Sequence, residues 1–158
     1  MFPLILESTT PQECVRTAAF LRTRLADQPE RLALALEWLE SAQQSKEGCH
    51  FFVAHSQQGA CRAVAPARWV AGAAGVLEVQ DFVAAEDQHG SLWAALDGFL
   101  KTFIQQQRGR LLIAHLCSVD RAELISFLLC QGWKKAGVIA HYYSPDHHQV
   151  ILVFALNQ

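Results

Sequence analysis

The sequence predicts a single α/β (α+β) domain over residues 1–158, built on a mixed, mostly antiparallel sheet. One parallel strand pair is expected at the centre of that sheet, with helices on both faces. In the first half, short glycine-containing turns separate three strand-like segments, which is typical of an antiparallel meander. A long amphipathic helix then separates two further strand-like segments, and a crossover of this kind joins parallel neighbours.

The composition is that of a well-packed globular protein. Of its 158 residues, 51% are hydrophobic and 18% are charged, so a sizeable core can form and disorder is disfavoured. The formal net charge is −2 and no basic run occurs, which argues against a nucleic-acid partner. No uncharged apolar run approaches the ~20 residues of a membrane span, and the first residues lack the pattern of a signal peptide. We therefore expect a cytoplasmic protein with no membrane partner.

The cysteines and histidines form no metal-binding pattern. The five cysteines make no Cys-x-x-Cys pair, and reduced thiols are the expectation for a cytosolic protein. His115 lies in an apolar strand and is expected to be a buried, hydrogen-bonded core residue rather than a ligand. Cys117 ends that strand before a helix, a position that can activate a thiol, but no sequence feature supplies a His partner for it. No metal site is predicted.

The first half of the chain predicts a strand, two helices and then strands. Thr10, Pro11 and Glu13 have the pattern of a helix start with a capping box. The helices are expected over residues 11–25 and 29–44, after a first strand at 2–7. Three strands are expected over residues 49–55, 60–70 and 76–83, and Pro66 in the second indicates a bulge or an edge.

The strand at 76–83 has a break in its alternation. Leu77 and Val79 alternate as one buried face requires, but the next large apolar residue is Phe82. One extra residue near Gln80 and Asp81 would restore the pattern, which indicates a β-bulge. A bulge can separate a strand from its neighbour and leave backbone groups available to a ligand. A strand that buries both faces is the alternative.

A polar loop, with Glu86, Asp87, Gln88 and His89, leads from this strand into the long helix. Apolar residues at helical spacing follow it: Leu92, Leu96, Phe99, Leu100, Phe103 and Ile104. The free N–H groups and the dipole at a helix start favour an anion, phosphate included. A plain strand–helix connection is the alternative.

After Gly109 the sequence indicates a strand, a short helix and a final strand pair. Residues 110–117 form a near-continuous apolar run, typical of a strand covered on both faces, and this strand is expected to lie parallel to residues 76–83. The short helix is expected over residues 121–131, and the final strands over 133–143 and 149–156.

Two segments resemble the GNAT superfamily of acetyl-coenzyme A-dependent N-acetyltransferases, and the order of elements resembles it along nearly the whole chain. In the first segment Val83 closes a strand, and Ala85-Glu86 stands for the family's Pro-Glu pair. Residues 88–93, Gln-His-Gly-Ser-Leu-Trp, occupy its phosphate loop of type R/Q-x-x-G-x-G/A. Gln88 matches the first position and Gly90 is displaced by one. Ser91 and Trp93 stand where the family has small residues.

The second segment covers residues 120–133. Gly132-Trp133 is similar to the Gly-Phe pair that ends the family's short helix and opens the next strand. The family often carries a Tyr four residues before this Gly as general acid toward the leaving thiolate, and Leu128 stands there. Cys117-Ser118 stands where an Asn often ends the preceding strand. Tyr142 or Tyr143 could replace the missing donor, although packing in the last strand pair is the simpler interpretation.

The resemblance implies acetyl-CoA as cofactor and direct attack of an amine on its thioester carbonyl. Glu78 is the implied catalytic base, acting directly or through water, with a solvated strand carboxylate as the alternative. Asp81 and Glu86 are weaker candidates for the base. The implied cofactor-binding residues are Phe82, Val83, Gln88, His89, Gly90, Ser91, Leu92, Trp93 and Ser118.

The function implied is therefore an N-acetyltransferase acting on a small-molecule or protein amine. The alternative is a catalytically silent GNAT-like domain that binds acyl-CoA or a protein partner, which the loop and Leu128 favour. A third interpretation is an unrelated α/β binding module with the same order of elements. The sequence leaves the acceptor and a homodimer open.

Overall fold

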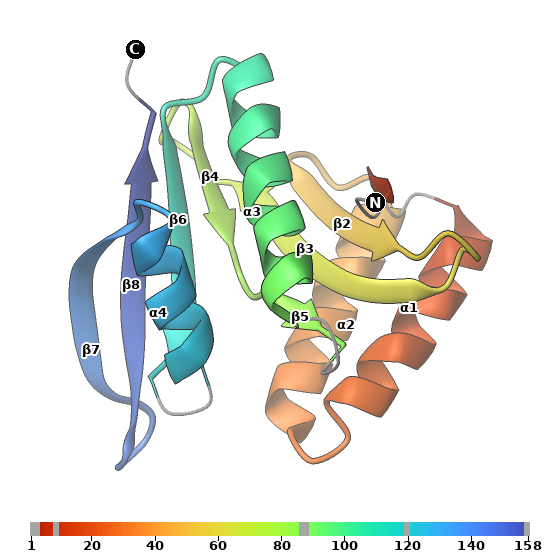
Figure 1. Ribbon diagram of the computed structural model, residues 1–158, viewed down its shortest axis with the longest axis horizontal. Coiled ribbons are helices and arrows are strands. Elements are labelled where there is room, and N and C mark those ends of the chain that lie inside the picture. Colours follow the sequence, from red (N-terminus) through yellow and green to blue (C-terminus); the bar gives the residue numbers. More distant parts are fainter. Residues whose placement is uncertain (1–3, 8–9, 86–88, 119–120, 157–158) are drawn as a thin grey trace. The chain divides into compact units, whose positions relative to one another are not determined.

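The computed structural model of the protein describes residues 4–7, 10–85, 89–118 and 121–156 (Figure 1). The chain divides into two compact units. The first unit comprises Met1–Arg68 and Phe82–Phe99, and the second unit comprises Trp69–Asp81 and Leu100–Gln158. No helix among the described residues is long and apolar enough to cross a membrane.

The sheet of the first unit is antiparallel. Strand β1 (Leu4–Glu7) pairs with β2 (Cys49–His55), and β2 pairs with β3 (Cys61–Trp69). The two-residue strand β5 (Val83–Ala84) pairs with the other edge of β3, where Val83 lies opposite Val64. The predicted antiparallel pairing of the strands at 49–55 and 60–70 is confirmed, whereas β5 was not predicted as a separate strand.

Helices α1 (Pro11–Arg24) and α2 (Pro29–Gln43) follow β1. The capping box predicted for α1 is confirmed, because the Glu13 N–H donates to Thr10 Oγ1 at 3.2 Å and the Thr10 N–H donates to Glu13 Oε2 at 3.4 Å. Two otherwise unsatisfied donors at the helix start are thereby paired. Proline begins both helices, where its missing N–H costs no helical bond.

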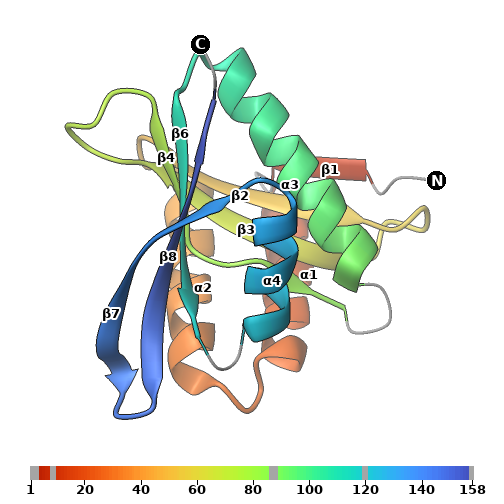
Figure 2. The same ribbon diagram turned by 60° about the vertical axis from the view of Figure 1, so that its left-hand side comes forward.

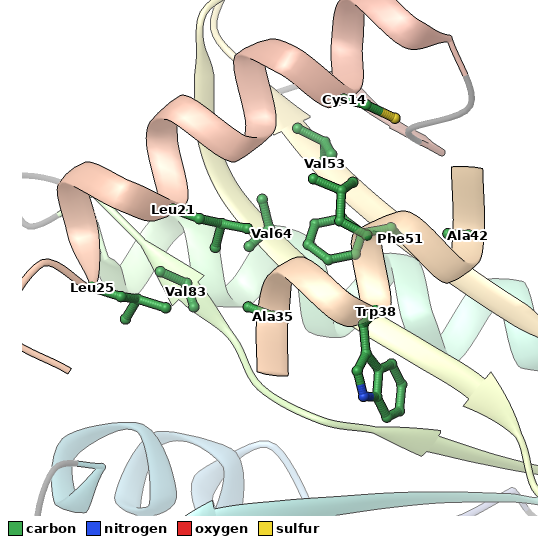
Figure 3. Packing of buried hydrophobic residues seen from close by; sticks show 11 residues of the cluster. Cys14, Leu21, Leu25, Ala35, Trp38, Ala42, Phe51, Val53, Val64 and Val83 are labelled. Atoms are coloured by element: carbon green, nitrogen blue, oxygen red, sulfur yellow. The ribbon is translucent and has the colours of Figure 1, made fainter. Parts of the chain in front are cut away.

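One apolar cluster joins α1 and α2 to one face of the first unit's sheet (Figure 3). Leu21 of α1, Leu39 of α2 and Phe51 of β2 are at most 4% exposed within it. The other members are Cys14, Leu25, Ala35, Trp38, Ala42, Val53, Val64 and Val83.

The opposite face of β2 meets a third helix. Phe52 contacts Phe99 of α3 (His89–Gln106), with ring centroids 5.0 Å apart. Because Phe51 and Phe52 point to opposite faces and are 0% and 1% exposed, β2 is buried on both sides. The predicted placement of helices on both faces is confirmed in this unit.

The sheet of the second unit has the order β4-β6-β8-β7 (Figure 2). Its strands are β4 (Val76–Val79), β6 (Leu111–Cys117), β7 (Lys134–Ser144) and β8 (His147–Ala155). Strands β4 and β6 are parallel, with Val76 opposite Leu111, while the pairs β6–β8 and β7–β8 are antiparallel. The predicted mixed sheet with one parallel pair is confirmed.

One face of this sheet is closed by helices. Phe154 of β8 contacts Trp133, with centroids 6.0 Å apart, and Lys101 Nζ of α3 lies 4.2 Å from the Phe154 centroid. Figures 1 and 2 show helix α4 (Ala122–Cys130) over β6 and β8. The buried residues that alternate toward this closed face are Leu77, Val79, Leu112, Ala114, Leu116, Val150 and Leu152.

The other face of the second unit's sheet is half-open. The residues that alternate toward it include Glu78 of β4, Ile113 and His115 of β6, and Ile151 and Val153 of β8, and each of these is half-buried. The expectation that β6 is covered on both faces is therefore wrong, since its apolar run continues through positions that still meet water. A continuous apolar run does not by itself distinguish complete from partial cover.

The expected bulge is instead a longer interruption. Strand β4 ends at Val79 and β5 begins at Val83, so residues 80–82 lie outside both strands. Asp81 forms an ion pair with Arg121 at the start of α4, and Phe82 is fully buried. These two residues give the segment other partners than a strand ladder, which explains why more than one residue leaves the strand.

Strand β7 forms an edge of the second unit's sheet, and Val138, Ile139 and Tyr142 on it are exposed. Near its end, His141 adopts a positive φ of 55°. Its N–H donates to His148 Nδ1 at 3.0 Å, which joins the two arms of the β7–β8 hairpin. This bond helps to offset the strain of a left-handed conformation in a residue other than glycine.

Candidate functional site

The first turn of α3, in the first unit, is open to an anion. The first four N–H groups of a helix have no partner within it, and here they belong to residues 89–92. Gly90 and Ser91 are exposed, while Leu92 and Trp93 are buried. A Cβ added to Gly90 would meet nothing within 4 Å. No acidic side chain lies in this turn, so the helix dipole there is not opposed.

The structure describes the other candidate residues of the loop to different extents. Gln88 and Glu86 lie outside the described residues, and His89 is placed by its backbone as the first residue of α3. Trp93 is only 8% exposed, so its bulk lies in the interior rather than over the helix start. The departure from a small residue at this position therefore leaves the exposed side of the turn unobstructed.

Phe82 and Val83 use their side chains for packing. They are 0% and 4% exposed, and Val83 belongs to the apolar cluster of the first unit. Any contact that these two residues make with a ligand must come from their backbone atoms.

Glu78, the candidate base, lies on the half-open face of the second unit. Its Oε1 is 3.5 Å from His115 Nε2, and the two side chains are 15% and 24% exposed. The register of the β4–β6 pair explains why Glu78 and His115 are in contact. Glu78 lies opposite Ile113 in the parallel pair, and His115 is the next residue along β6 on the same face. His115 was expected in the core, and the structure gives it an acidic partner instead.

The residues around this pair are mainly aliphatic. Ile113 lies beside Glu78, and Ile151 of β8 lies opposite His115. Both are half-buried. A carboxylate in such a setting is less hydrated than one on an open surface, which strengthens its interaction with a nearby cation or proton donor.

Asp81 is committed to a different partner. Its Oδ1 accepts a hydrogen bond from Arg121 Nη2 at 2.6 Å, and both side chains are 14% exposed. Charge-assisted bonds of this kind are among the strongest in proteins. The carboxylate of Asp81 therefore serves to hold the chain after β4 to the start of α4, and it is a poor candidate for a base.

Ser118 ends β6 and is joined to β8. Its N–H donates to the His148 carbonyl at 2.9 Å, and its Oγ accepts from the His148 N–H at 3.2 Å. A hydroxyl that accepts one bond still has a proton to donate, so Ser118 retains one polar function for a ligand.

The positions considered for an acid are unfavourable. Leu128 is fully buried in α4, and Tyr142 is 57% exposed on the edge strand β7. The side chain of Tyr143 lies outside the described part of the chain. Cys117 is buried and, like the other four cysteines, is a free thiol. The described residues contain no group of three His, Cys, Asp or Glu side chains able to hold a metal ion.

Comparison with known proteins gives structural matches only. No protein-family model matches the sequence, and no curated protein matches it. A crystal structure from Desulfovibrio desulfuricans assigned to the GNAT family of acetyltransferases is 19% identical, with a TM-score of 0.83 over 96% of this chain and 98% of that one. The aminoglycoside 6'-N-acetyltransferase from Enterococcus faecium is 12% identical, with a TM-score of 0.76 over 98% of each chain.

A third structure, an aminoglycoside 6'-N-acetyltransferase complexed with coenzyme A, is 13% identical, with a TM-score of 0.74 over 98% of each chain. The identities in all three cases are low, so the likeness concerns the fold. It extends over almost the whole of each chain, and not over one shared motif.

Proposed function

We propose that this chain, which has the fold of the GNAT superfamily, is an N-acetyltransferase that moves an acetyl group from acetyl-CoA to an amine of a small molecule or a protein. The observation that carries the proposal is the position of Glu78. It is a half-buried carboxylate on the parallel strand pair of the shared fold, on a sheet face that is still reached by water.

The residues present fit the cofactor. The start of α3, where Gly90 is exposed and has open space over it, suits the pyrophosphate of a coenzyme A. In this proposal residues 88–93 hold the pyrophosphate, Phe82 and Val83 contribute backbone groups, and Ser118 contributes its hydroxyl. Bound acetyl-CoA supplies an activated thioester carbonyl. The aminoglycoside acetyltransferase crystallised with coenzyme A supports this choice of cofactor.

Glu78 has the role of general base. An amine is protonated at neutral pH and is not nucleophilic in that form, so a group must take its proton before attack. A half-buried carboxylate that water can still reach is able to accept this proton. Leu128 has no proton to donate to the departing thiolate, so in this proposal the thiolate leaves as an anion or takes its proton from water.

A second candidate is a catalytically silent domain that binds acyl-CoA or a protein partner. The observation that favours it is the complete burial of Leu128 at the position of the family's general acid. The two candidates separate in one assay series. The enzyme binds acetyl-CoA and acetylates members of an amine panel, whereas the silent domain binds acetyl-CoA and acetylates none.

We also propose that residues 1–158 act as one domain in the cytoplasm. The match to a GNAT structure over 96% of this chain and 98% of the other supports the single domain. None of the five cysteines is in a disulfide, which fits a reducing compartment.

Calorimetric titration of acetyl-CoA into Gly90→Pro and Gly90→Ala tests the phosphate site. Proline removes one N–H that has no partner within the helix and is tolerated in a first turn, whereas alanine keeps that N–H. A hydrogen bond to a charged group contributes about 1.5–3 kcal/mol, so Gly90→Pro is expected to bind roughly 10-fold or more weakly than Gly90→Ala.

Gly98→Ala is the matched control, because Gly98 lies further along α3 and a Cβ there also meets nothing within 4 Å. It is expected to bind acetyl-CoA like the wild type. Equal affinity of Gly90→Pro and Gly90→Ala, with unchanged helical circular dichroism, would exclude the Gly90 N–H from the site.

A further inference from the structure

We infer that His115 is a positioning residue for Glu78 and the next proton acceptor after it. With its own proton on Nδ1, the neutral imidazole takes at Nε2 the proton that Glu78 has removed from the amine, and the resulting imidazolium holds the carboxylate through its Nε2–H. This inference rests on the proposed acetyl transfer and adds to it a residue and a route by which the proton leaves.

The distance supports a contact that can tighten. The separation of 3.5 Å between His115 Nε2 and Glu78 Oε1 is slightly longer than an ordinary hydrogen bond. Catalytic hydrogen bonds are often long in the free enzyme and shorten once substrate is bound. Both side chains extend from adjacent strands of a hydrogen-bonded sheet, so a small change of side-chain torsion is enough to close the gap.

The exposed fractions of the two side chains indicate that the proton moves from Glu78 to His115 and then to water. Glu78 is 15% exposed and His115 is 24% exposed, so the imidazole has the better access to water. The nearest residues on the same face of β6 are Ile113 and Cys117, and Ile151 lies opposite on β8. Of these neighbours only the buried Cys117 thiol can titrate. His115 is therefore a polar group through which the Glu78 proton can reach solvent.

The alternative carboxylate does not compete for this role. Asp81 is only three residues from Glu78, but its Oδ1 is held by the Arg121 guanidinium at 2.6 Å. Its strong bond to a permanent cation leaves it poorly suited to accept and pass on a proton. Glu78, by contrast, faces an imidazole, which can gain and lose a proton near neutral pH.

The proton balance of the route is simple. The N–H bond of the ammonium breaks and its proton moves to Glu78, which becomes a neutral carboxylic acid. The proton then passes from Glu78 to the unprotonated Nε2 of a neutral His115 that carries its own proton on Nδ1, which restores the carboxylate and forms an imidazolium. The imidazolium releases one proton to water. No oxidant, reductant or other reactant is required.

The turnover of His115→Gln distinguishes a residue that only positions the Glu78 carboxylate from one that also accepts its proton. The glutamine amide nitrogen can occupy a position close to Nε2 and donate to Glu78, but it cannot take up a proton. We expect turnover to fall roughly 100-fold, the usual scale for a proton-transfer group, while the affinity for acetyl-CoA stays unchanged. Val153→Ala, on the same sheet face but on β8, is the control and should keep turnover within about threefold of the wild type.

Chemical rescue by imidazole is a second test, because added imidazole would not restore turnover if His115 had only a structural role. In His115→Gly, added imidazole should restore turnover at least 10-fold, because free imidazole can replace the missing relay, and it should leave Ile113→Gly unaffected. Wild-type turnover in His115→Gln, or failure of imidazole to rescue His115→Gly while that variant still binds acetyl-CoA, would overturn the inference.

The failure of the relay can be distinguished from the failure of the proposed function. If the wild type transfers acetyl to no amine in the panel, the proposed function fails and the relay fails with it. If the wild type is active and His115→Gln equals it, only the relay is overturned. The ¹⁵N signals of the His115 ring, assigned by their absence in His115→Gln, should shift in Glu78→Gln, and unchanged signals would likewise overturn the coupling of the two side chains.

Discussion

The two units are made of the same kinds of elements, but they expose their strands differently. In the first unit β2 is buried on both faces, by Phe51 toward α1 and α2 and by Phe52 toward α3. In the second unit the sheet is closed on one face, and the other face keeps Glu78 and His115 half-buried. On a strand that is buried on both faces, a charged side chain would lose its hydration at a large cost in free energy. A catalytic base is therefore expected on a face that stays half-open.

The first way to sharpen this comparison is to truncate one large side chain in each unit. Phe51→Ala should lower the free energy of unfolding by about 3–5 kcal/mol, because it removes a fully buried ring and leaves a cavity. Ile113→Ala on the half-open face should cost less than half as much, because that side chain already meets water. Urea unfolding followed by circular dichroism measures both. Equal losses would show that the two units do not differ in this way.

The second test measures activity instead of stability. Glu78→Gln keeps the shape of the side chain and removes the base, so turnover should fall roughly 100-fold or more with little change in affinity for acetyl-CoA. The measurement is the initial rate of acetyl transfer to an acceptor identified in the panel.

Asp81→Asn is the matched control for that test. It weakens the bond to Arg121 and should lower the free energy of unfolding by about 1.5–3 kcal/mol, while turnover stays within a few-fold of the wild type at a temperature where the protein is folded. If Glu78→Gln retained full turnover, Glu78 would be a structural carboxylate and the difference between the two acids would disappear.

The smallest expected effect concerns two thiols. Burial raises the pKa of Cys61 in the first unit from its ordinary value of 9.0 to about 12, whereas Cys130 in the second unit is exposed. At pH 8 to 9 an alkylating reagent should therefore modify Cys130 readily and the half-buried Cys61 much more slowly, as mass spectrometry of the labelled peptides can show. Modification of both thiols at the same rate in the native protein would contradict the raised pKa of Cys61.

The same shift gives Cys61 a definite effect on stability. Below pH 9 the thiol is protonated in both the folded and the unfolded chain, so it causes no pH dependence. Between about pH 9 and 12 only the unfolded chain loses the proton, so the free energy of unfolding falls as the pH rises. Cys61→Ala should remove this part of the alkaline slope.

The sequence was most informative where the deciding contacts are local. The capping box of α1 joins Thr10 to Glu13, three residues away, and the parallel pair follows from the helix between its strands. His115 was missed as a site residue because its partner is on another strand and the register decides the meeting. The parallel pairing was predicted, but its register, which places Glu78 opposite Ile113, was not.

The interruption after β4 illustrates the same limit. Alternation alone indicated one extra residue near Gln80 and Asp81, whereas the strand is absent over residues 80–82. The contact that holds Asp81 comes from Arg121, 40 residues further along the chain. No local pattern in the sequence reports a partner at that distance, so the presence of an irregularity could be predicted and its extent could not.

The parallel pairing of β4 with β6 also bears on the order in which the chain folds. Val76 and Leu111 are 111 − 76 = 35 residues apart, whereas Ser144 and His147 of the β7–β8 hairpin are 147 − 144 = 3 residues apart. Closing the longer loop costs more entropy, and hairpins form within roughly 1–10 μs. We expect the hairpin to form early in folding and β4 to join β6 late. The Glu78–His115 pair depends on that late step, so a partly folded chain can already have most of its core while it still lacks this pair.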